Sequence, residues 1–361
     1  MRITNSMMTQ SVIRNINNNM QRLNEAQQET STGLEIQEAS DDPIAATKTL
    51  QYRSVIAKIE QYQSNATDAT SWMKVTDDTL ESLTDTVQQI RDLTSKASSD
   101  VLDDTQLEAI SAEVSELKNT ILELLNTQYA DRYIFGGYAT AEAPYTETTA
   151  TYTDVATGET TTLSTISFKD GYLSLGGVVS TSADSTALLA LYNANSANVY
   201  TSTDSQEITY NTGYSSQTAV NVEGQDVTGT GTGNLFDTID KLLLGLDGET
   251  SYQSVTVDAS TGVASVVTTE FTMDELLDEI DANLAEISTA TSDLGARMNY
   301  VETCTSRLTS DYTTYTGLLS ENIDSDISVA TTEYATAQTI YDASLSVGAK
   351  VITKSLVDYL T

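Results

Sequence analysis

The sequence predicts an α+β protein: a long antiparallel helical bundle, or coiled-coil rod, formed by both chain ends, with an inserted mostly-β domain. Three observations predict this fold class. Apolar residues recur at alternating spacings of three and four through both flanks of the 361-residue chain, which is the spacing of one face of a long helix. Fourteen of the 18 glycines lie between Gly136 and Gly262. The only prolines are Pro43 and Pro144, so the flanks are almost free of helix breakers.

The first flank is predicted to form one helix over about 43–98 and a second helix after it. Asp42 can cap the first helix, and Pro43 stands at the first helical position, where its missing N–H costs nothing. Either aspartate of the pair at 103–104 can cap the second helix, which has its own apolar ladder over 107–124. The ladder of the first helix consists of Tyr52, Val55, Ile59, Tyr62, Ala66, Ala69, Met73, Thr76, Leu80, Leu83, Val87, Ile90, Thr94 and Ala97.

The second flank repeats the pattern and has a well-marked start. Thr272 and Glu275 form a capping box, and Phe271 can pack on Leu276. A seam as narrow as these ladders is not stable alone, so each flank needs partner helices, and the other flank is the nearest candidate. The second ladder consists of Leu277, Ile280, Leu284, Ile287, Thr291, Leu294, Met298, Val301, Thr305, Leu308, Tyr312, Tyr315 and Leu319.

The middle of the chain is predicted to be mostly β. The segments 166–168 and 173–175 flank an Asp-Gly pair, which is a hairpin signal. The segments 254–257 and 263–267 flank a second turn with a glycine. One amphipathic helix, over about 234–246, interrupts the strands. Because both ends of this region adjoin predicted helix ends, we expect the helical flanks to fold without it.

The two chain ends carry short apolar ladders without an evident partner in the chain except each other. Short helices of weak propensity are marginal in isolation. We therefore expect both ends to be disordered in a free monomer and helical once neighbours cover them. The expected organisation is a terminal assembly segment over 1–40, a first helical part over 41–138, the β-rich domain over 139–271, a second helical part over 272–325 and a C-terminal assembly helix over 326–361.

The composition excludes several classes of function. The chain has 52 Asp and Glu against 17 Lys and Arg, a net charge of −35, which would repel nucleic acid and anionic membranes. Without histidine and with one cysteine, a His-based catalytic site or an internal disulfide cannot form. We expect no catalytic residues, cofactor or metal. The N-terminus resembles no cleaved signal peptide, which leaves a cytoplasmic protein or export without a cleaved signal.

Candidate chemical motifs have structural explanations. The aspartate pairs at 41–42, 77–78 and 103–104 point about 100° apart on a helix, so their spacing makes no dyad, and two of them stand at predicted helix starts. The segment 229–233 has three glycines but neither the Lys-Ser/Thr ending of a P-loop nor G-x-G-x-x-G. Cys304 borders the second ladder and is interpreted as a packing residue. An acidic glycosidase with two carboxylates remains the enzymatic alternative, and a coiled-coil sensor would need a membrane span.

Several segments resemble the flagellin superfamily. The N-terminal signature of that superfamily is similar to Ser31-Thr-Gly33 followed by Ser40-Asp-Asp-Pro-Ile-Ala-Ala46. Flagellins usually have Asp-Asp-Ala-Ala-Gly there, and the Asp-Asp-Pro-Ile form resembles instead the hook–filament junction family of hook-associated protein 3. The segment 132–138 also resembles that family, and the segments 294–299 and 344–360 resemble the closing segment of the flagellin superfamily. The matching signature residues are Ser40, Asp41, Asp42, Pro43 and Ile44.

The resemblance implies an extracellular structural subunit of the bacterial flagellum, exported through the flagellar type III apparatus. Its partners would be itself in a ring, the neighbouring hook-associated junction protein, flagellin and an export chaperone, with no nucleic acid or membrane. Flagellin itself is the alternative function. The expected assembly interface comprises Ile13, Ile16, Met20, Leu23, Tyr334, Tyr341, Leu345, Ile352, Leu356 and Leu360.

Overall fold

The computed structural model describes residues 5–99, 103–153, 160–169, 171–172, 189–190, 192–193, 206–257 and 264–357. The chain divides into two compact units. The terminal unit combines residues 1–61 with residues 307–361, and the central unit spans residues 62–306. Each unit therefore takes helices from both flanks.

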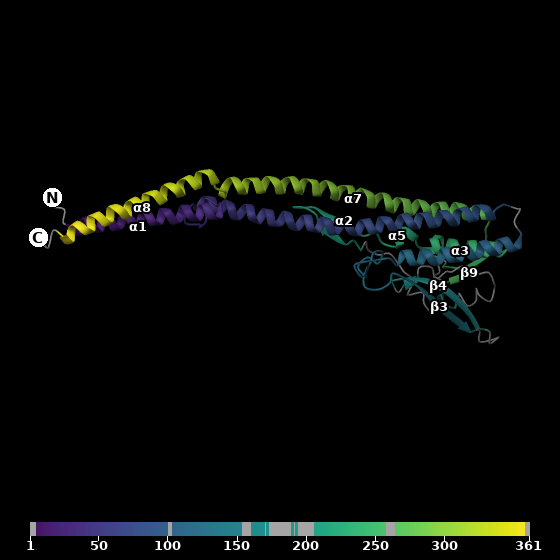
Figure 1. Ribbon diagram of the computed structural model, residues 1–361. Coiled ribbons are helices and arrows are strands. Elements are labelled where there is room, and N and C mark those ends of the chain that lie inside the picture. Colours follow the sequence, from purple (N-terminus) through teal and green to yellow (C-terminus); the bar gives the residue numbers. More distant parts are fainter. Residues whose placement is uncertain are drawn as a thin grey trace. The chain divides into compact units, whose positions relative to one another are not determined.

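Five long helices form the flanks, as the ladders predict (Figure 1). The predicted helix over about 43–98 is confirmed, and the fold class is confirmed with it. The helices are α1 (Asn5–Thr32), α2 (Pro43–Ala97), α3 (Asp104–Leu125), α7 (Met273–Ile323) and α8 (Ile327–Val357).

The helix starts have the local chemistry that the sequence indicates. Asp103 caps α3, and Gln106 completes a capping box with it. At the start of α7, the Thr272 hydroxyl accepts the Glu275 N–H at 3.3 Å while the Glu275 carboxylate accepts the Thr272 N–H at 2.9 Å. Side chains thus satisfy backbone donors that have no partner within the helix.

In the terminal unit, α1 and α8 lie side by side in antiparallel orientation (Figure 1). Backbone hydrogen bonds tie together the two connections that follow α1 and α7. The Glu35 N–H donates to the Ile323 carbonyl at 2.8 Å, and the Ser325 N–H donates to the Gly33 carbonyl at 2.9 Å. The Asn322 amide also donates to the Ala45 carbonyl at 2.9 Å. The start of α2 and the end of α7 are therefore held together within this unit.

The central unit is built on the predicted seams. Most members of the first ladder between Ala66 and Thr94 are buried, and the second flank buries Ile280, Ile287, Leu294 and Val301 against them. The same cluster of buried apolar side chains includes Val220, Phe236, Ile239 and Leu242 from the inserted region. The helical part of this unit and the insert therefore share one hydrophobic core, and this argues against the expectation that the flanks fold without the insert.

The insert consists of short antiparallel hairpins around one helix. Phe168 pairs with Gly171 at the predicted Asp-Gly turn, while residues 173–175 lie outside the described residues. The second predicted hairpin is confirmed as β8 and β9, and the predicted helix over about 234–246 is confirmed as α6 (Leu235–Leu246). The strands are β1 (Gln128–Tyr129), β2 (Arg132–Tyr133), β3 (Tyr145–Thr153), β4 (Thr160–Phe168), β5 (Gly171–Tyr172), β6 (Thr209–Asn211), β7 (Gln217–Ala219), β8 (Ser251–Val257) and β9 (Ala264–Glu270), and two short turns of helix are α5 (Gln225–Thr228) and η2 (Gly231–Gly233).

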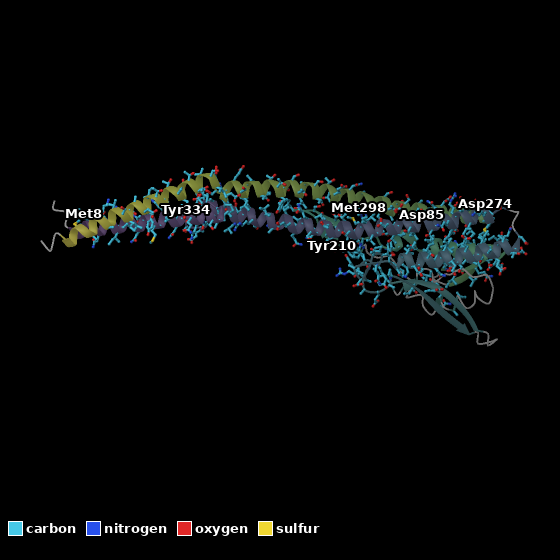
Figure 2. All side chains as sticks on the ribbon, viewed as in Figure 1. Met8, Asp85, Tyr210, Asp274, Met298 and Tyr334 are labelled. Carbon is cyan, nitrogen blue, oxygen red and sulfur yellow. The ribbon has the colours of Figure 1, made fainter. Side chains whose placement is uncertain are left out.

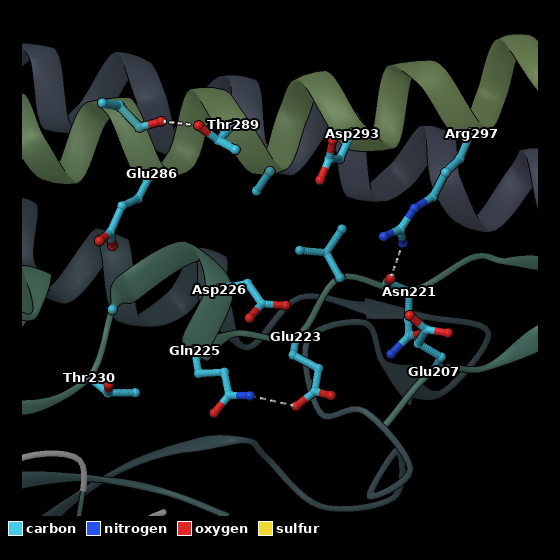
Figure 3. Close-up of a pocket in the computed structure, with 14 residues that line it drawn as sticks. Glu207, Asn221, Glu223, Gln225, Asp226, Thr230, Glu286, Thr289, Asp293 and Arg297 are labelled. Carbon is cyan, nitrogen blue, oxygen red and sulfur yellow. Dashed lines mark hydrogen bonds between the residues drawn. The ribbon is translucent and has the colours of Figure 1, made fainter. Parts of the chain in front are cut away.

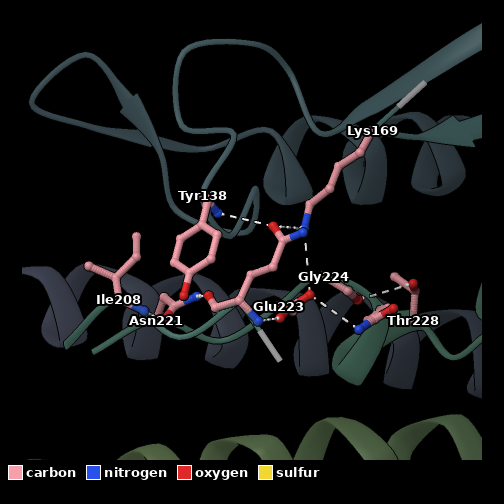
Figure 4. A network of polar contacts seen from close by, with 9 residues as sticks. Tyr138, Lys169, Ile208, Asn221, Glu223, Gly224 and Thr228 are labelled. Carbon is pink, nitrogen blue, oxygen red and sulfur yellow. Dashed lines mark hydrogen bonds and ion pairs between the residues drawn. The ribbon is translucent and has the colours of Figure 1, made fainter. Parts of the chain in front are cut away.

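A buried polar network fastens the insert (Figure 4). The Lys169 ammonium contacts the Glu223 carboxylate at 3.5 Å and donates to the Gln206 amide oxygen at 3.0 Å. The same oxygen accepts the Tyr138 N–H at 3.2 Å. The Lys169 and Glu223 side chains are almost fully buried, so each charge needs the other. The network thereby joins three separate stretches of the insert to the backbone of Tyr138, just before the insert.

Lys241 is a second buried lysine, and the first prediction concerns its carboxylate partner. The Lys241 ammonium on α6 lies 2.9 Å from the Glu279 carboxylate on α7, with its side chain only 3% exposed and that of Glu279 38% exposed. The substitution Glu279→Ala removes the carboxylate partner of a buried cation, so we expect the free energy of unfolding to fall by about 2 kcal/mol. Urea denaturation of the variant measures it.

Asp278→Ala is the matched control for this prediction. Asp278 is the neighbouring residue on α7, and its side chain is exposed. Both substitutions remove one negative charge, so the change in long-range repulsion is shared and cancels in the comparison. Equal denaturation midpoints for the two variants would contradict the predicted role of Glu279.

Candidate assembly interface

Apolar side chains are distributed unevenly between the two units. Twelve of the sixteen large apolar side chains that are exposed among the described residues lie on the terminal unit. Only five of the thirty-nine buried apolar residues of the described part lie there. The twelve exposed residues are Met7, Met8, Ile13, Met20, Ile44, Leu50, Leu318, Ile327, Val329, Ile340, Leu345 and Val347. A contiguous set of helices that exposes so much apolar surface is typical of an interaction site.

The net negative charge is concentrated on the central unit, whereas the exposed apolar side chains are concentrated on the terminal unit. The terminal unit has nine Lys and Arg against fourteen Asp and Glu, whereas the central unit has eight against thirty-eight. The net charges are therefore −5 and −30. The unit with the exposed apolar side chains is thus the one that another protein can approach with little electrostatic repulsion.

The seam between α1 and α8 explains the placement of the predicted interface residues. Partly or fully buried residues recur at spacings of three and four on both helices. The residues at these spacings on α1 are Thr9, Val12, Ile16, Asn19, Leu23, Ala26 and Thr30, beside which Glu29 is also partly buried, and on α8 they are Ala330, Tyr334, Ala337, Tyr341, Ser344 and Gly348. Of the predicted residues, this seam contains Ile16, Leu23, Tyr334 and Tyr341 (Figure 2 labels Tyr334).

The other predicted interface residues lie elsewhere. Ile13, Met20 and Leu345 are 47%, 44% and 42% exposed, outside the seam. Ile352 and Leu356 belong to α8, with side chains outside the described part, and Leu360 lies beyond the described residues.

Sequence reasoning missed Gly348. A Cβ at this position would lie 3.0 Å from Ile16 Cδ1 and 3.2 Å from Val12 Cγ1, so the absent side chain allows the two helices to approach closely. The signal that could have found it is the alternation of tyrosine with alanine, serine and glycine along one face of α8.

The residues of the family signature form the connection between α1 and α2. The Asp42 carboxylate accepts the N–H groups of Ile44 at 2.8 Å and Ala45 at 3.1 Å, as an N-cap does. The Asp41 carboxylate accepts the Glu38 N–H at 3.0 Å, and the Ser40 hydroxyl donates to the Glu38 carboxylate at 3.2 Å. Ile44 follows Pro43 and is 71% exposed, so its side chain is available to a partner.

The capping role of Asp42 gives the second prediction. Asp42→Ala leaves the first N–H groups of α2 without their side-chain acceptor, so we expect the free energy of unfolding to fall by about 1 kcal/mol. Asp42→Asn keeps a capping oxygen and is expected to change the free energy of unfolding by only a few tenths of a kcal/mol. Thermal denaturation of both variants measures the difference. A loss of the same size with asparagine would mean that charge, and not capping, is what Asp42 contributes.

A polar pocket of about 680 Å³ in the central unit is the alternative candidate site (Figure 3). Its lining includes Glu223, Asp226, Glu286, Asp293 and Arg297. Burial, and next the nearby Glu223 carboxylate, raise the pKa of Asp226. In the described part of the chain, no three His, Cys, Asp or Glu side chains are grouped so that they could hold a metal ion. None of the helices in that part is both long and apolar enough to cross a membrane.

The N-terminal part of the chain is similar to the flagellins. Residues 3–140 match the bacterial flagellin N-terminal helical region. Flagellin from Clostridium tyrobutyricum is 30% identical over 125 residues, which are 35% of this chain and 33% of that protein.

The chain is also similar to flagellar hook-associated protein 3. The protein of that name from Escherichia coli K12 is 31% identical over 153 residues, and the one from Salmonella typhimurium is 28% identical over 153 residues. Each match covers 42% of this chain and 48% of the relative, so the chain spans about half the length of these relatives. The predicted resemblance is confirmed.

A solved structure supports the fold. The structure described as a putative flagellar hook-associated protein from Vibrio parahaemolyticus superimposes with a TM-score of 0.54 at 16% identity. The match covers 79% of this chain and all of that one. At this identity the likeness concerns the fold.

Proposed function

We propose that this chain is a structural subunit of the bacterial flagellum, the adaptor at the hook–filament junction that joins the hook-side junction protein to flagellin. The observation that carries the proposal is the terminal unit, which exposes twelve large apolar side chains with a net charge of only −5. Its residues 3–61 belong to the segment that matches the flagellin N-terminal helical region. Such a unit is suited to be covered by other subunits. Its role is structural and not enzymatic.

Flagellin itself is the second candidate function. The flagellin match covers 33% of that relative, and the hook-associated matches cover 48% of theirs. The Asp42-Pro43-Ile44 sequence, with Ile44 exposed, also favours the junction protein. The longer matches and this sequence together make the junction role the leading proposal.

The proposed partners follow from the junction role. They are other copies of the chain in a ring, the neighbouring hook-associated junction protein, flagellin and an export chaperone. The proposed location is extracellular, on the flagellum, after export without a cleaved signal peptide. Nucleic acid and membranes are not proposed partners, since the chain carries a net charge of −35.

Electron microscopy of a strain that lacks this gene tests the proposal. We expect hooks without filaments, with flagellin released into the medium, and recovery of filaments when the gene is supplied in trans. Immunogold labelling separates the two candidates: a junction protein is labelled at one point near the hook, and flagellin along the whole filament. Normal filaments in the deletion strain would refute both.

The third prediction concerns the mobility of the two terminal helices. We propose that α1 and α8 are mobile in the dilute monomer, because their seam contains tyrosine, alanine, serine and glycine on α8 and three polar residues beside apolar ones on α1. Limited proteolysis should remove roughly the first 40 and last 35 residues and leave a resistant core, since cleavage concentrates in loosely held termini. Hydrogen exchange checks the same point. Protection of both ends at low concentration would contradict it.

A further inference from the structure

A short hairpin of the insert contacts both α2 and α7 inside the central unit. Its strands β6 and β7 pair in antiparallel fashion up to Asn211 and Gln217, and residues 212–216 form the turn between them. The Thr212 and Thr218 side chains are buried, and their hydroxyls are hydrogen-bonded to each other at 3.2 Å. These contacts hold the turn in a defined position.

Two contacts tie the hairpin to α2. The side-chain amide of Asn65 on α2 donates to the Asn211 carbonyl at 2.9 Å. At the turn, the Tyr214 ring stands edge-on to the Tyr62 ring, with the two centroids 5.7 Å apart and an interplanar angle of 77°. Edge-to-face packing is a favoured arrangement of aromatic pairs. One tie to α2 is therefore polar and the other is aromatic.

Two further contacts tie the same hairpin to α7. The Arg297 guanidinium donates to the carbonyl of Asn221, just after β7, at 3.0 Å (Figure 3). The Tyr300 hydroxyl, further along α7, is hydrogen-bonded to the Ser216 hydroxyl at 2.6 Å. The turn therefore holds one residue of each helix, through Tyr214 on one side and Ser216 on the other.

Both helices are intrinsically weak where the hairpin contacts them. In α2, six of the ten residues over 62–71 are Ser, Thr, Asn or Asp, which favour a helix less than Ala or Leu do. The buried ladder positions of this stretch are Ala66 and Ala69, whose small side chains bury less apolar area than Leu80 further along the ladder. In α7, residues 295–306 include one glycine, one asparagine and two threonines. Contacts from outside the two helices are thus needed to keep these stretches closed.

We propose that the β6–β7 hairpin is a clasp that closes α2 onto α7, so that residues 62–71 and 295–306 open and close together as one local unfolding unit. One ordered turn couples two stretches that are far apart in the chain and individually weak. Proteins open in such cooperative units without losing their cores. Tyr62 is the first residue of the central unit and Ser306 is its last, so the clasp controls the stretches at which the chain enters and leaves this unit.

Hydrogen exchange of the full chain, followed by mass spectrometry, tests the proposal. The double variant Tyr214→Ala with Ser216→Ala removes the side chains through which the turn contacts the two helices. Ser215→Ala is the matched control, because Ser215 lies between these residues and its side chain is exposed. Residues 80–90 of α2 are the internal reference for global unfolding. Circular dichroism checks that each variant keeps its helix content.

We expect exchange of the double variant to be about tenfold faster over both 62–71 and 295–306. Over the reference stretches 80–90 and 276–287 it should change by less than about twofold, and Ser215→Ala should leave all four stretches unchanged. Unchanged exchange of the double variant, or faster exchange in one helix only, would overturn the proposal. Equal acceleration in the reference stretches, or by Ser215→Ala, would overturn it as well.

Tyr300→Phe is a milder variant that serves if the double variant loses helix content. It removes only the hydroxyl that contacts Ser216 and keeps the ring. Because the clasp couples the two helices, we expect about threefold faster exchange over 62–71 as well as over 295–306. Acceleration confined to α7, or none at all, would overturn the coupling.

The clasp goes beyond the junction role and does not rest on it. Hydrogen exchange measures the purified chain and is independent of where the chain resides in a cell. Normal filaments in the deletion strain would refute the junction role, while unchanged exchange of the double variant would refute only the clasp.

Discussion

Replacing residues 142–269 by a short Gly/Ser linker is expected to give a product that keeps much of its helix content but no longer melts cooperatively. The buried side chains of Phe236, Ile239 and Leu242 belong to the same core cluster as those of α2, α3 and α7. Their removal takes away part of the cluster in which Leu276 and Ile280 are also buried. Losing several large buried side chains at about 1.5–3 kcal/mol each exceeds the stability of an ordinary domain.

A smaller deletion in the same region is the control. Val255 forms a satellite cluster with Leu189, Tyr192, Ala264 and Val266, separate from the main core. Replacing residues 253–268 by a turn that links Tyr252 to Thr269, which pair across the hairpin, therefore removes insert residues but leaves the main core covered. We expect this variant to melt as one transition, measured by calorimetry and circular dichroism. A single sharp transition of the large deletion as well would show that the helices form a core of their own.

Replacing Gly224 by alanine is expected to destabilise the central unit by about 2–3 kcal/mol. A Cβ at this position would meet the Tyr145 hydroxyl and would lie 2.7 Å from Tyr145 Cε2 and 2.9 Å from Phe168 Cε2. Both rings are fully buried, and their centroids lie 4.9 Å apart. The Tyr145 hydroxyl is also hydrogen-bonded to the Thr228 hydroxyl at 2.9 Å. Neither ring can move aside without disturbing the core, so the strain is not relieved.

The same substitution at Gly295 should have the opposite sign. Gly295 lies within α7, and nothing lies within 4 Å of the position that its Cβ would occupy. Alanine there reduces the freedom of the unfolded chain and is expected to stabilise the protein by roughly 0.5–1 kcal/mol. Urea denaturation of both variants measures the change in the free energy of unfolding, which should be a decrease for Gly224→Ala and an increase for Gly295→Ala. Two changes of like sign and size would mean that the Tyr145 site repacks around the new methyl group.

Local patterns were sufficient to predict where the helices begin and which of their residues are buried in the central unit. Asp103 and Thr272 cap helices as their neighbours in sequence indicate. Leu80, Val87 and Ile90 are buried as the ladder predicts. Helix spacing and capping depend on residues at most four positions apart, so the amino-acid sequence alone contains that information. The flagellin-like signature is local in the same sense.

Contacts between distant segments decided the rest. The terminal ladder predicts Leu345, but the seam turns Ser344 and Gly348 toward α1, because small residues let the backbones approach and the tyrosines set the period. The shared core of helices and insert and the burial of Lys241 against Glu279 both depend on residues far apart in the chain. Apolar spacing indicates that a face will be covered. Which segment covers it depends on the shape of the packed surface and on where its charges lie in space. Both are defined only once the helices have packed.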